Sequence, residues 1–232
     1  MRYLAFAFLF AVALCLEGFG TTEAFTGEDM QCMQQNGLDN LFIWRGYLNI
    51  GKIDDTGVAN LKTAIELGIQ RTTVYMNPNV KGDAAAQAAE VCNHLNTVIA
   101  GWRFRVLVSI QRRDKWSTDQ AANREFVNAL ANAIRADPKC YGTGFYTSKE
   151  DYEAILGADF SDLSADYLWI FLKHDKDPTL KDFKPFGGWV KPFYKEYIPD
   201  TKEVCTKTID RMSFVYNGAS NADDMVLAAA SQ

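Results

Sequence analysis

Apolar positions along the chain follow two periods, one typical of strands and one of helices. Short apolar runs rich in β-branched and aromatic residues predict buried strands at 41–44, 72–76, 104–110, 141–146, 167–172, 193–197 and 209–216. Between most of them apolar residues recur at helical spacing, which predicts helices at 31–36, 58–68, 83–99, 117–134 and 148–156. Strands that alternate with helices predict parallel βα units in a single α/β domain, arranged as a barrel or a doubly wound sheet.

The strand at 104–110 is the one around which the rest of this pattern is organised. Ser109 lies at its carboxyl end and Gln111 follows directly, and a capping-box sequence at Ser117 starts the next helix. In parallel α/β folds the carboxyl ends of strands carry the chemistry. The side chains offered here are a hydroxyl and an amide, beside a basic run that we interpret as a solvated loop face. None of them is a ready proton donor or base.

Composition limits the classes of function. The 232 residues carry a formal net charge of -5 and are 48% hydrophobic, which fits one well-buried domain. Mild acidity argues against a nucleic-acid partner. There is no glycine-rich phosphate loop and no nucleotide motif, so we expect no cofactor. The oligomeric state has no signal in the sequence.

The amino terminus predicts export. Arg2 precedes an apolar run at 3–16 that ends near the small residues Gly18 and Gly20, which is typical of a secretory signal. The run is too short to span a bilayer, so we expect no membrane partner. We therefore predict a signal peptide at 1–20, a domain at 21–216 and a flexible tail at 217–232 in a secreted, extracellular or lysosomal protein.

Four cysteines remain after the predicted signal. They form an even set in an oxidising compartment, and three pairings are possible. Their wide, irregular spacing fits no metal site. We favour one disulfide that joins the two ends of the domain and one within it, namely Cys32–Cys205 and Cys92–Cys140.

Several segments together resemble one family, the Ch-type lysozymes of glycoside hydrolase family 25, in their animal and amoebal branch. The segments are Gln31-Cys32 with Asn36-Gly37, Arg45-Gly46-Tyr47, Val74-Tyr75-Met76 with Pro78, the stretch from Trp116 to Phe126, Tyr146-Thr147-Ser148, and 183–189 with Lys191-Pro192. The resemblance implies a modified, TIM-like (β/α) barrel, irregular or incomplete, with a groove that binds peptidoglycan at the carboxyl ends of its strands.

The chain departs from that family at the catalytic acids. The family's Asp and Glu, one residue apart, correspond to Ser109 and Gln111. A further family Asp belongs to a first strand ahead of Cys32, for which too few residues remain after signal removal. Only Asp210 resembles the family's fourth acid. Glycoside cleavage needs a proton donor and a carboxylate that opposes a cationic transition state, so the replacements predict a pseudoenzyme.

Glycan binding does not require the catalytic acids, so the chain can bind a glycan without cleaving it. Aromatic and amide side chains near strand ends can stack on sugar rings and form hydrogen bonds to them, and the candidates are Tyr47, Tyr75, Asn77, Tyr146 and Trp169. Trp169 lies inside an apolar run and is equally well interpreted as a core residue.

Three hypotheses follow. The first is a secreted, catalytically inactive lysozyme-like protein that binds peptidoglycan or another glycan in host defence. The second is a weak or altered glycosidase that uses Asp210 and another carboxylate, for which Asp114 is the candidate. The third is a storage or structural role. We interpret His94 and the pair His174-Asp175 as surface or core residues without a catalytic role.

Overall fold

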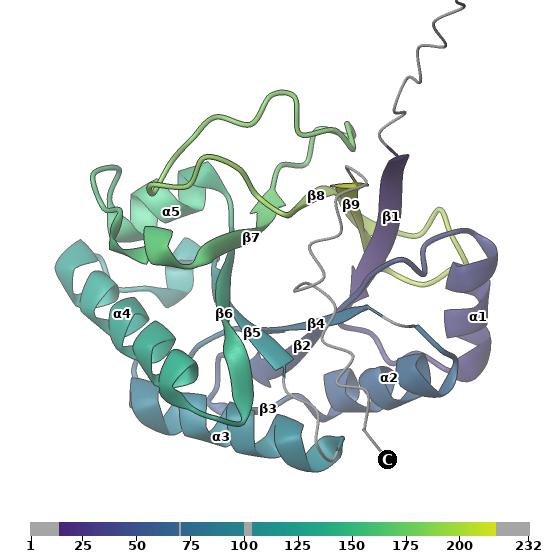
Figure 1. Cartoon of the computed structure of the whole chain (residues 1–232), viewed down its shortest axis with the longest axis horizontal. Helices are drawn as coiled ribbons and strands as arrows, with labels where there is room; N and C mark the ends of the chain where they lie inside the picture. The colour runs from purple at the N-terminus through teal and green to yellow at the C-terminus, as the bar shows by residue number, and fades with distance from the viewer. Residues whose placement is uncertain (1–13, 70, 100–103, 217–232) are drawn as a thin grey trace, which may run out of the picture.

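Eight strands close a barrel in the computed structural model, which describes residues 14–69, 71–99 and 104–216 (Figure 1). The sheet order is β1-β9-β8-β7-β6-β5-β4-β2-β3, and pairing of β1 with β2 completes the ring. β3 pairs with β2 alone, at the edge. The strands are β1 (Leu14–Thr21), β2 (Phe42–Leu48), β3 (Lys52–Ile53), β4 (Thr72–Met76), β5 (Phe104–Ile110), β6 (Cys140–Thr147), β7 (Tyr167–Leu172), β8 (Tyr194–Thr201) and β9 (Ile209–Tyr216). The predicted α/β barrel is confirmed.

The helices lie around the outside of this barrel (Figure 1). They are α1 (Gly27–Gln35), α2 (Asp55–Glu66), α3 (Ala84–Val98), α4 (Gln120–Ala136) and α5 (Lys149–Leu156), with short 3-10 turns η1 (Arg113–Lys115) and η2 (Asp162–Ala165). Ser148, the first residue of the predicted helix 148–156, is the N-cap of α5 and accepts a hydrogen bond from the Asp151 amide. The predicted cap at Ser117 is wrong. Asp119 caps α4 instead, accepting from two amides of the first turn.

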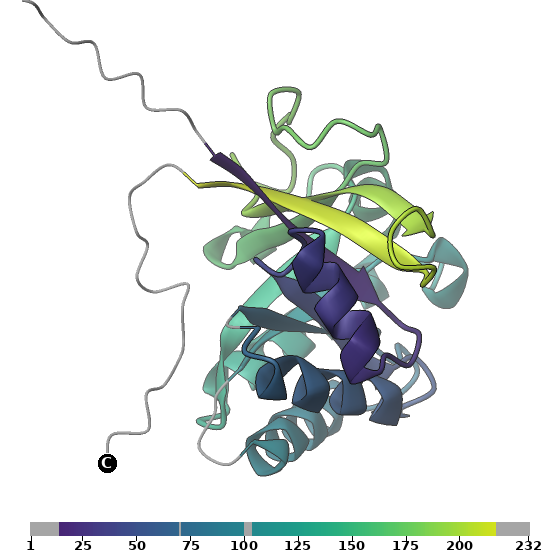
Figure 2. The same cartoon turned by 90° about the vertical axis from the view of Figure 1, so that its right-hand side faces the viewer.

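Strand direction decides which residues share an end of the barrel. β1, β2 and β4 to β8 run parallel, whereas β9 is antiparallel to both of its neighbours. Asp210 near the start of β9 is therefore opposite Gly20 near the end of β1. This places Asp210 at the carboxyl end of the parallel strands, which we call the mouth of the barrel. Figure 2 shows β1 and β9 side by side.

β1 is formed by residues that the sequence prediction assigned to the signal peptide. Its residues pair with β2 on one side and with β9 on the other. Phe19 is fully buried, and Arg211 forms an ion pair with Glu17. A Cβ at Gly18 would lie 2.3 Å from the Leu41 carbonyl oxygen, so only glycine allows this approach of the two chains. The strand that we expected to be incomplete is present in full in the described chain, and a chain that began at residue 21 would lack it.

Two apolar layers hold the barrel together. The larger layer fills the space between the sheet and the helices, and the smaller one fills the barrel. Interior members come from strand positions of matching parity, as expected for side chains that alternate between faces. They include Ile43, Leu107, Ile170, Leu172, Tyr194 and Met212.

Aromatic residues and one arginine close the amino end of the barrel. The Arg105 guanidinium lies 4.7 Å from the centre of the Trp169 ring, and Tyr141 and Tyr167 lie 5.3 and 5.4 Å away on its other sides. Phe193 stacks on Trp169 at 4.7 Å. We call these five residues the basal cluster; cation–π contacts of this kind add to the stability of an already apolar end.

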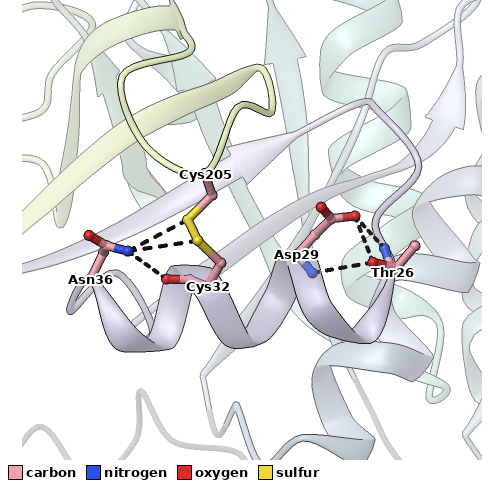
Figure 3. Close-up of a disulfide and its surroundings, with 5 residues drawn as sticks. All are labelled: Thr26, Asp29, Cys32, Asn36 and Cys205. Carbon is pink, nitrogen blue, oxygen red and sulfur yellow. Dashed lines mark hydrogen bonds between the residues drawn. A yellow bond between two sulfur atoms is a disulfide. The ribbon is translucent and has the colours of Figure 1, made fainter.

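Both favoured disulfides are present. Cys92–Cys140 connects α3 to β6, and Cys32–Cys205 connects α1 to the loop between β8 and β9. The Asn36 side chain donates to the Cys32 carbonyl, and Thr26 and Asp29 form a capping box at the start of the same helix (Figure 3). Among the described residues, none of the helices has the length and apolar character that a membrane span requires. The predicted tail at 217–232 lies outside them.

Candidate functional site

Polar side chains gather at the mouth because the strand register turns alternate residues inward. Tyr75 is paired with Leu107, Ser109 with Tyr146, and Leu172 with Glu196, so these residues share the inner face of the barrel. Asp210 joins them two positions along β9 from the interior residue Met212. β8 and β9 therefore each bring a carboxyl group to the mouth.

Glu196 is the carboxylate that sequence reasoning missed. Glu196 is only 3% exposed, and both of its carboxylate oxygens have hydrogen-bond partners. The Tyr146 hydroxyl donates to Oε2, and His174 Nε2 lies 2.7 Å from Oε1. Burial of a carboxyl group is costly without such partners. The hydrogen bond that His174 donates to Glu196 raises the pKa of His174, which favours the imidazolium form.

Asp210 has a pKa raised far above the usual value of an aspartate. Burial, and then the negative charge of Glu196, raise its pKa from 3.8 to about 7. One oxygen, Oδ1, accepts a hydrogen bond of 2.9 Å from the Asp200 backbone amide. Two carboxyl groups that share a low-dielectric site resist ionising together, so the pair tends to retain one proton.

Lys195 fixes the loop that carries His174. It follows Tyr194 on β8 and points to the opposite face from Glu196, where it is fully buried. Its ammonium is 2.9 Å from Asp175 Oδ1 and donates to the Thr179 carbonyl at 3.1 Å. The backbone amides of Lys173 and Lys176 also donate to carbonyls of β8. Neighbouring residues on the loop thus contact opposite faces of β8, and His174 is held against Glu196.

Aromatic rings and a second ion pair complete the mouth. The Tyr75 and Tyr146 rings meet edge to face with their centres 5.2 Å apart. Burial raises the pKa of both phenols, so both remain protonated donors. Arg45 on β2 is the strand neighbour of Tyr75, and its Nε is 2.6 Å from Asp54 Oδ2.

Ser109 and Gln111, which the resemblance assigns to the acid positions, lie at the carboxyl end of β5 and contribute no charge. Ser109 is 3% exposed on the inner face of β5. Gln111 follows β5 and is half-buried, and its carbonyl accepts a hydrogen bond of 2.8 Å from Trp116 Nε1. Among the described residues, no group of three or more His, Cys, Asp and Glu side chains is arranged to hold a metal ion.

Not all of the sugar-stacking candidates reach the mouth. A β-bulge between Arg45 and Tyr47 turns the Tyr47 ring outward, where it is 1% exposed and its hydroxyl donates to Glu90 of α3. Trp169 belongs to the basal cluster at the other end of the barrel and is 4% exposed. Tyr75 remains half-buried, and Tyr146 is buried with only its hydroxyl engaged at the site.

Asn77, the remaining binding candidate, is half-buried directly after β4. Its backbone amide donates to the Tyr47 carbonyl at 3.0 Å, which places it at the mouth end of the strand.

Other sequence candidates have partners away from the carboxyl groups of β8 and β9. Asp114 is 65% exposed on its side chain and pairs with Lys115 at 2.8 Å. Arg113 points to Asp151 on α5 at 2.7 Å, which agrees with a solvated loop face. His94 is half-buried on α3. His174, which no sequence pattern places at the site, contacts a buried carboxylate at the mouth, and its side chain is 43% exposed.

With this geometry in place, comparison with known proteins shows the family. The sequence profile described as Lysozyme-like protein 1 matches residues 15–197. A probable GH family 25 lysozyme of Dictyostelium discoideum is 31% identical over 210 residues, covering 88% of this chain and 95% of that protein. The chain belongs to the family 25 lysozyme-like proteins. The profile match begins inside β1, which agrees with a first strand that is part of the domain.

Solved structures support the fold of this lysozyme-like chain. The bacterial lysozyme from Streptomyces coelicolor superposes with a TM-score of 0.65 at 16% identity, covering 92% of this chain and 96% of that one. The modular autolysin LytC from Streptococcus pneumoniae, in complex with a synthetic peptidoglycan ligand, superposes with a TM-score of 0.61 at 12% identity. The match covers 87% of this chain and 47% of LytC.

A sequence signal for the missed pair does exist in this lysozyme-like chain. Glu196 interrupts an aromatic strand, and a charged residue at a buried strand position is rare without a partner. His174 follows the preceding strand by two residues. Carboxyl ends of adjacent parallel strands meet at one edge, so the two side chains were candidates for contact once strand order was known.

Proposed function

We propose that this lysozyme-like chain is a secreted host-defence protein that binds peptidoglycan glycan at the barrel mouth without cleaving it. One observation carries the proposal. Ser109 faces the mouth at the end of β5 and Gln111 follows it, so neither acid position offers a carboxyl group. Family membership and the peptidoglycan complex of the structurally similar LytC support the ligand class.

The carboxyl groups that the structure does bring together do not replace the missing ones in our proposal. Glu196 is 3% exposed and has both oxygens engaged, so it is poorly placed to approach a sugar carbon. Asp210 alone has a free oxygen and the proton of a general acid. A lone acid without an accessible carboxylate lacks half of the machinery for glycoside cleavage.

The test combines binding and turnover. Purified, insoluble peptidoglycan should retain the protein in a sedimentation assay, while the turbidity of a cell-wall suspension should not fall. The double variant Ser109→Asp with Gln111→Glu places carboxyl groups in both acid positions and should gain lytic activity. Loss of turbidity with the unchanged protein would refute the absence of cleavage, and failure to sediment with peptidoglycan would refute binding.

A second candidate function is slow hydrolysis by Asp210 as proton donor with Glu196 as the stabilising carboxylate. The specific observation in its favour is the charge coupling of the two groups at the mouth. In this case the unchanged protein clears cell walls slowly, and Asp210→Asn and Glu196→Gln each abolish the activity. A residual activity that survives both substitutions would exclude this pair and point to a contaminating enzyme.

A further inference from the structure

Arg45 lies on a different strand from the carboxyl groups that β8 and β9 bring to the mouth. It is on β2, whereas Glu196 and Asp210 are on β8 and β9. The register places Arg45 two positions beyond the interior residue Ile43, beside Tyr75 of β4. The electrostatic surroundings of Tyr75 include Arg45 with its partner Asp54, together with Glu196 and Asp210. The mouth therefore carries a guanidinium on β2 and two carboxyl groups on β8 and β9.

The guanidinium is held rigidly. Its Nε is 2.6 Å from Asp54 Oδ2, and Asp54 is itself 5% exposed. The other oxygen of Asp54 accepts from the Thr56 amide at 3.2 Å, which caps α2. A Cβ at Gly57 would lie 1.8 Å from the Arg45 carbonyl oxygen, so α2 packs directly on the strand at this residue. A positioned carboxylate partner and a fixed backbone leave the guanidinium little freedom.

The two terminal amino groups of the Arg45 guanidinium remain available to a ligand. Asp54 is bound through Nε, and among the described residues the two terminal amino groups of Arg45 have no polar partner. The side chain is 23% exposed, so solvent and a ligand can reach it. Two parallel N–H donors on a planar group match the geometry of a carboxylate.

We propose that Arg45 is a specificity-determining residue that binds a carboxylate carried by the muramyl unit of the glycan. The inference rests on the proposed glycan binding at the mouth. A sugar ring against Tyr75 brings its acidic substituent to Arg45, whereas the opposite orientation would place that substituent beside the carboxyl groups of Glu196 and Asp210. Chitin-like glycans lack this substituent and gain nothing from the guanidinium.

The experiment uses two disaccharides that differ only at this group. One is N-acetylglucosaminyl-N-acetylmuramic acid with a free lactyl carboxylate, and the other is chitobiose. Dissociation constants are measured at pH 6 by NMR titration of the full-length protein. We expect the unchanged protein to prefer the acidic disaccharide by about tenfold, the size of one charge-assisted hydrogen-bond pair. Arg45→Met should remove the preference, and Arg45→Lys should retain only part of it, since lysine keeps the charge but loses the fork.

The controls separate this role from folding and from the proposed function. Arg113→Met removes an arginine that is 54% exposed on its side chain and pairs with Asp151 of α5, and it should keep the full preference. Unchanged binding of chitobiose by Arg45→Met shows that the variant is folded. If Arg45→Met still prefers the acidic disaccharide, or if the unchanged protein binds both sugars equally, the role of Arg45 is overturned while glycan binding stands. Binding of neither sugar overturns both proposals.

Discussion

Replacement of Asp210 by Asn should stabilise the protein at pH 8 and leave its stability unchanged at pH 4. Burial and the charge of Glu196 raise the pKa of Asp210 from 3.8 to about 7 in the folded state. Below pH 4 the carboxyl group is protonated in both the folded and the unfolded chain, so it has no effect on the free energy of unfolding. As pH rises from about 4 to 7, the unfolded chain releases its proton first, and stability is lost.

The size of this loss follows from the two pKa values. Their difference corresponds to about 4 kcal/mol at pH 8, an upper value because the site relaxes when it is charged. Asn cannot ionise, yet its side-chain oxygen can still accept the hydrogen bond from the Asp200 amide. We therefore expect the free energy of unfolding of Asp210→Asn to exceed that of the unchanged protein by about 2–4 kcal/mol at pH 8. The gain should be smaller at pH 6.

Urea unfolding followed by tryptophan fluorescence, with both disulfides intact, measures these differences at pH 4, 6 and 8. Asp114→Asn is the control, because that carboxylate is exposed and paired with Lys115; it should show no gain at pH 8. A gain from Asp210→Asn that is equal at all three pH values, or a loss at pH 8, would falsify the assignment of a buried, proton-retaining acid to this position.

Three further outcomes are expected. Replacing Cys32 and Cys205 by alanine opens a closed loop with a sequence separation of 173 residues. Urea unfolding should show a decrease in the free energy of unfolding of up to about 5 kcal/mol. An unchanged free energy would contradict the idea that this disulfide constrains the unfolded chain. Lys195→Met removes the buried partner of the Asp175 carboxylate and should lower the free energy of unfolding by about 2–4 kcal/mol. Adding Asp175→Asn in a double variant should restore part of this loss. If Lys195→Met has no effect on stability, the loop does not depend on this pair. The intact mass of protein secreted by cultured eukaryotic cells should give a first residue no later than Glu17, since β1 contributes Glu17 and Phe19 to the barrel; a chain starting at residue 21 would contradict this expectation.

Much of the architecture is readable from the sequence because its strands are buried on both faces. Four strands have the predicted bounds, namely β4, β5, β7 and β9. β-Branched and aromatic runs bounded by polar residues mark them clearly. β1 is the exception, because an apolar run at the amino terminus has the same composition whether it serves as a leader or as a strand. The run forms a strand because it pairs with β2 and β9, and no local sequence pattern carries information about that pairing.

The site was harder to predict, since it depends on which face each strand turns inward. Ser109 and Asp210 could be placed from the resemblance alone. Tyr47 could not, because a single bulge after Arg45 reverses its direction. Glu196 and Lys195 are adjacent in the chain and point to opposite layers, each to a partner on the loop after β7. Their burial depends on contacts between segments about 20 residues apart, for which local periodicity gives no signal.

The basal cluster determines from which end a ligand can reach the barrel. With Arg105 packed among Trp169, Tyr141 and Tyr167, the amino end of the barrel is occupied by side chains. Packed side chains at that end leave the mouth as the accessible end of the barrel. A glycan strand bound at the mouth, as we propose, would therefore lie across it without threading through the barrel, and sugars in the middle of a strand would be as accessible as those at its ends.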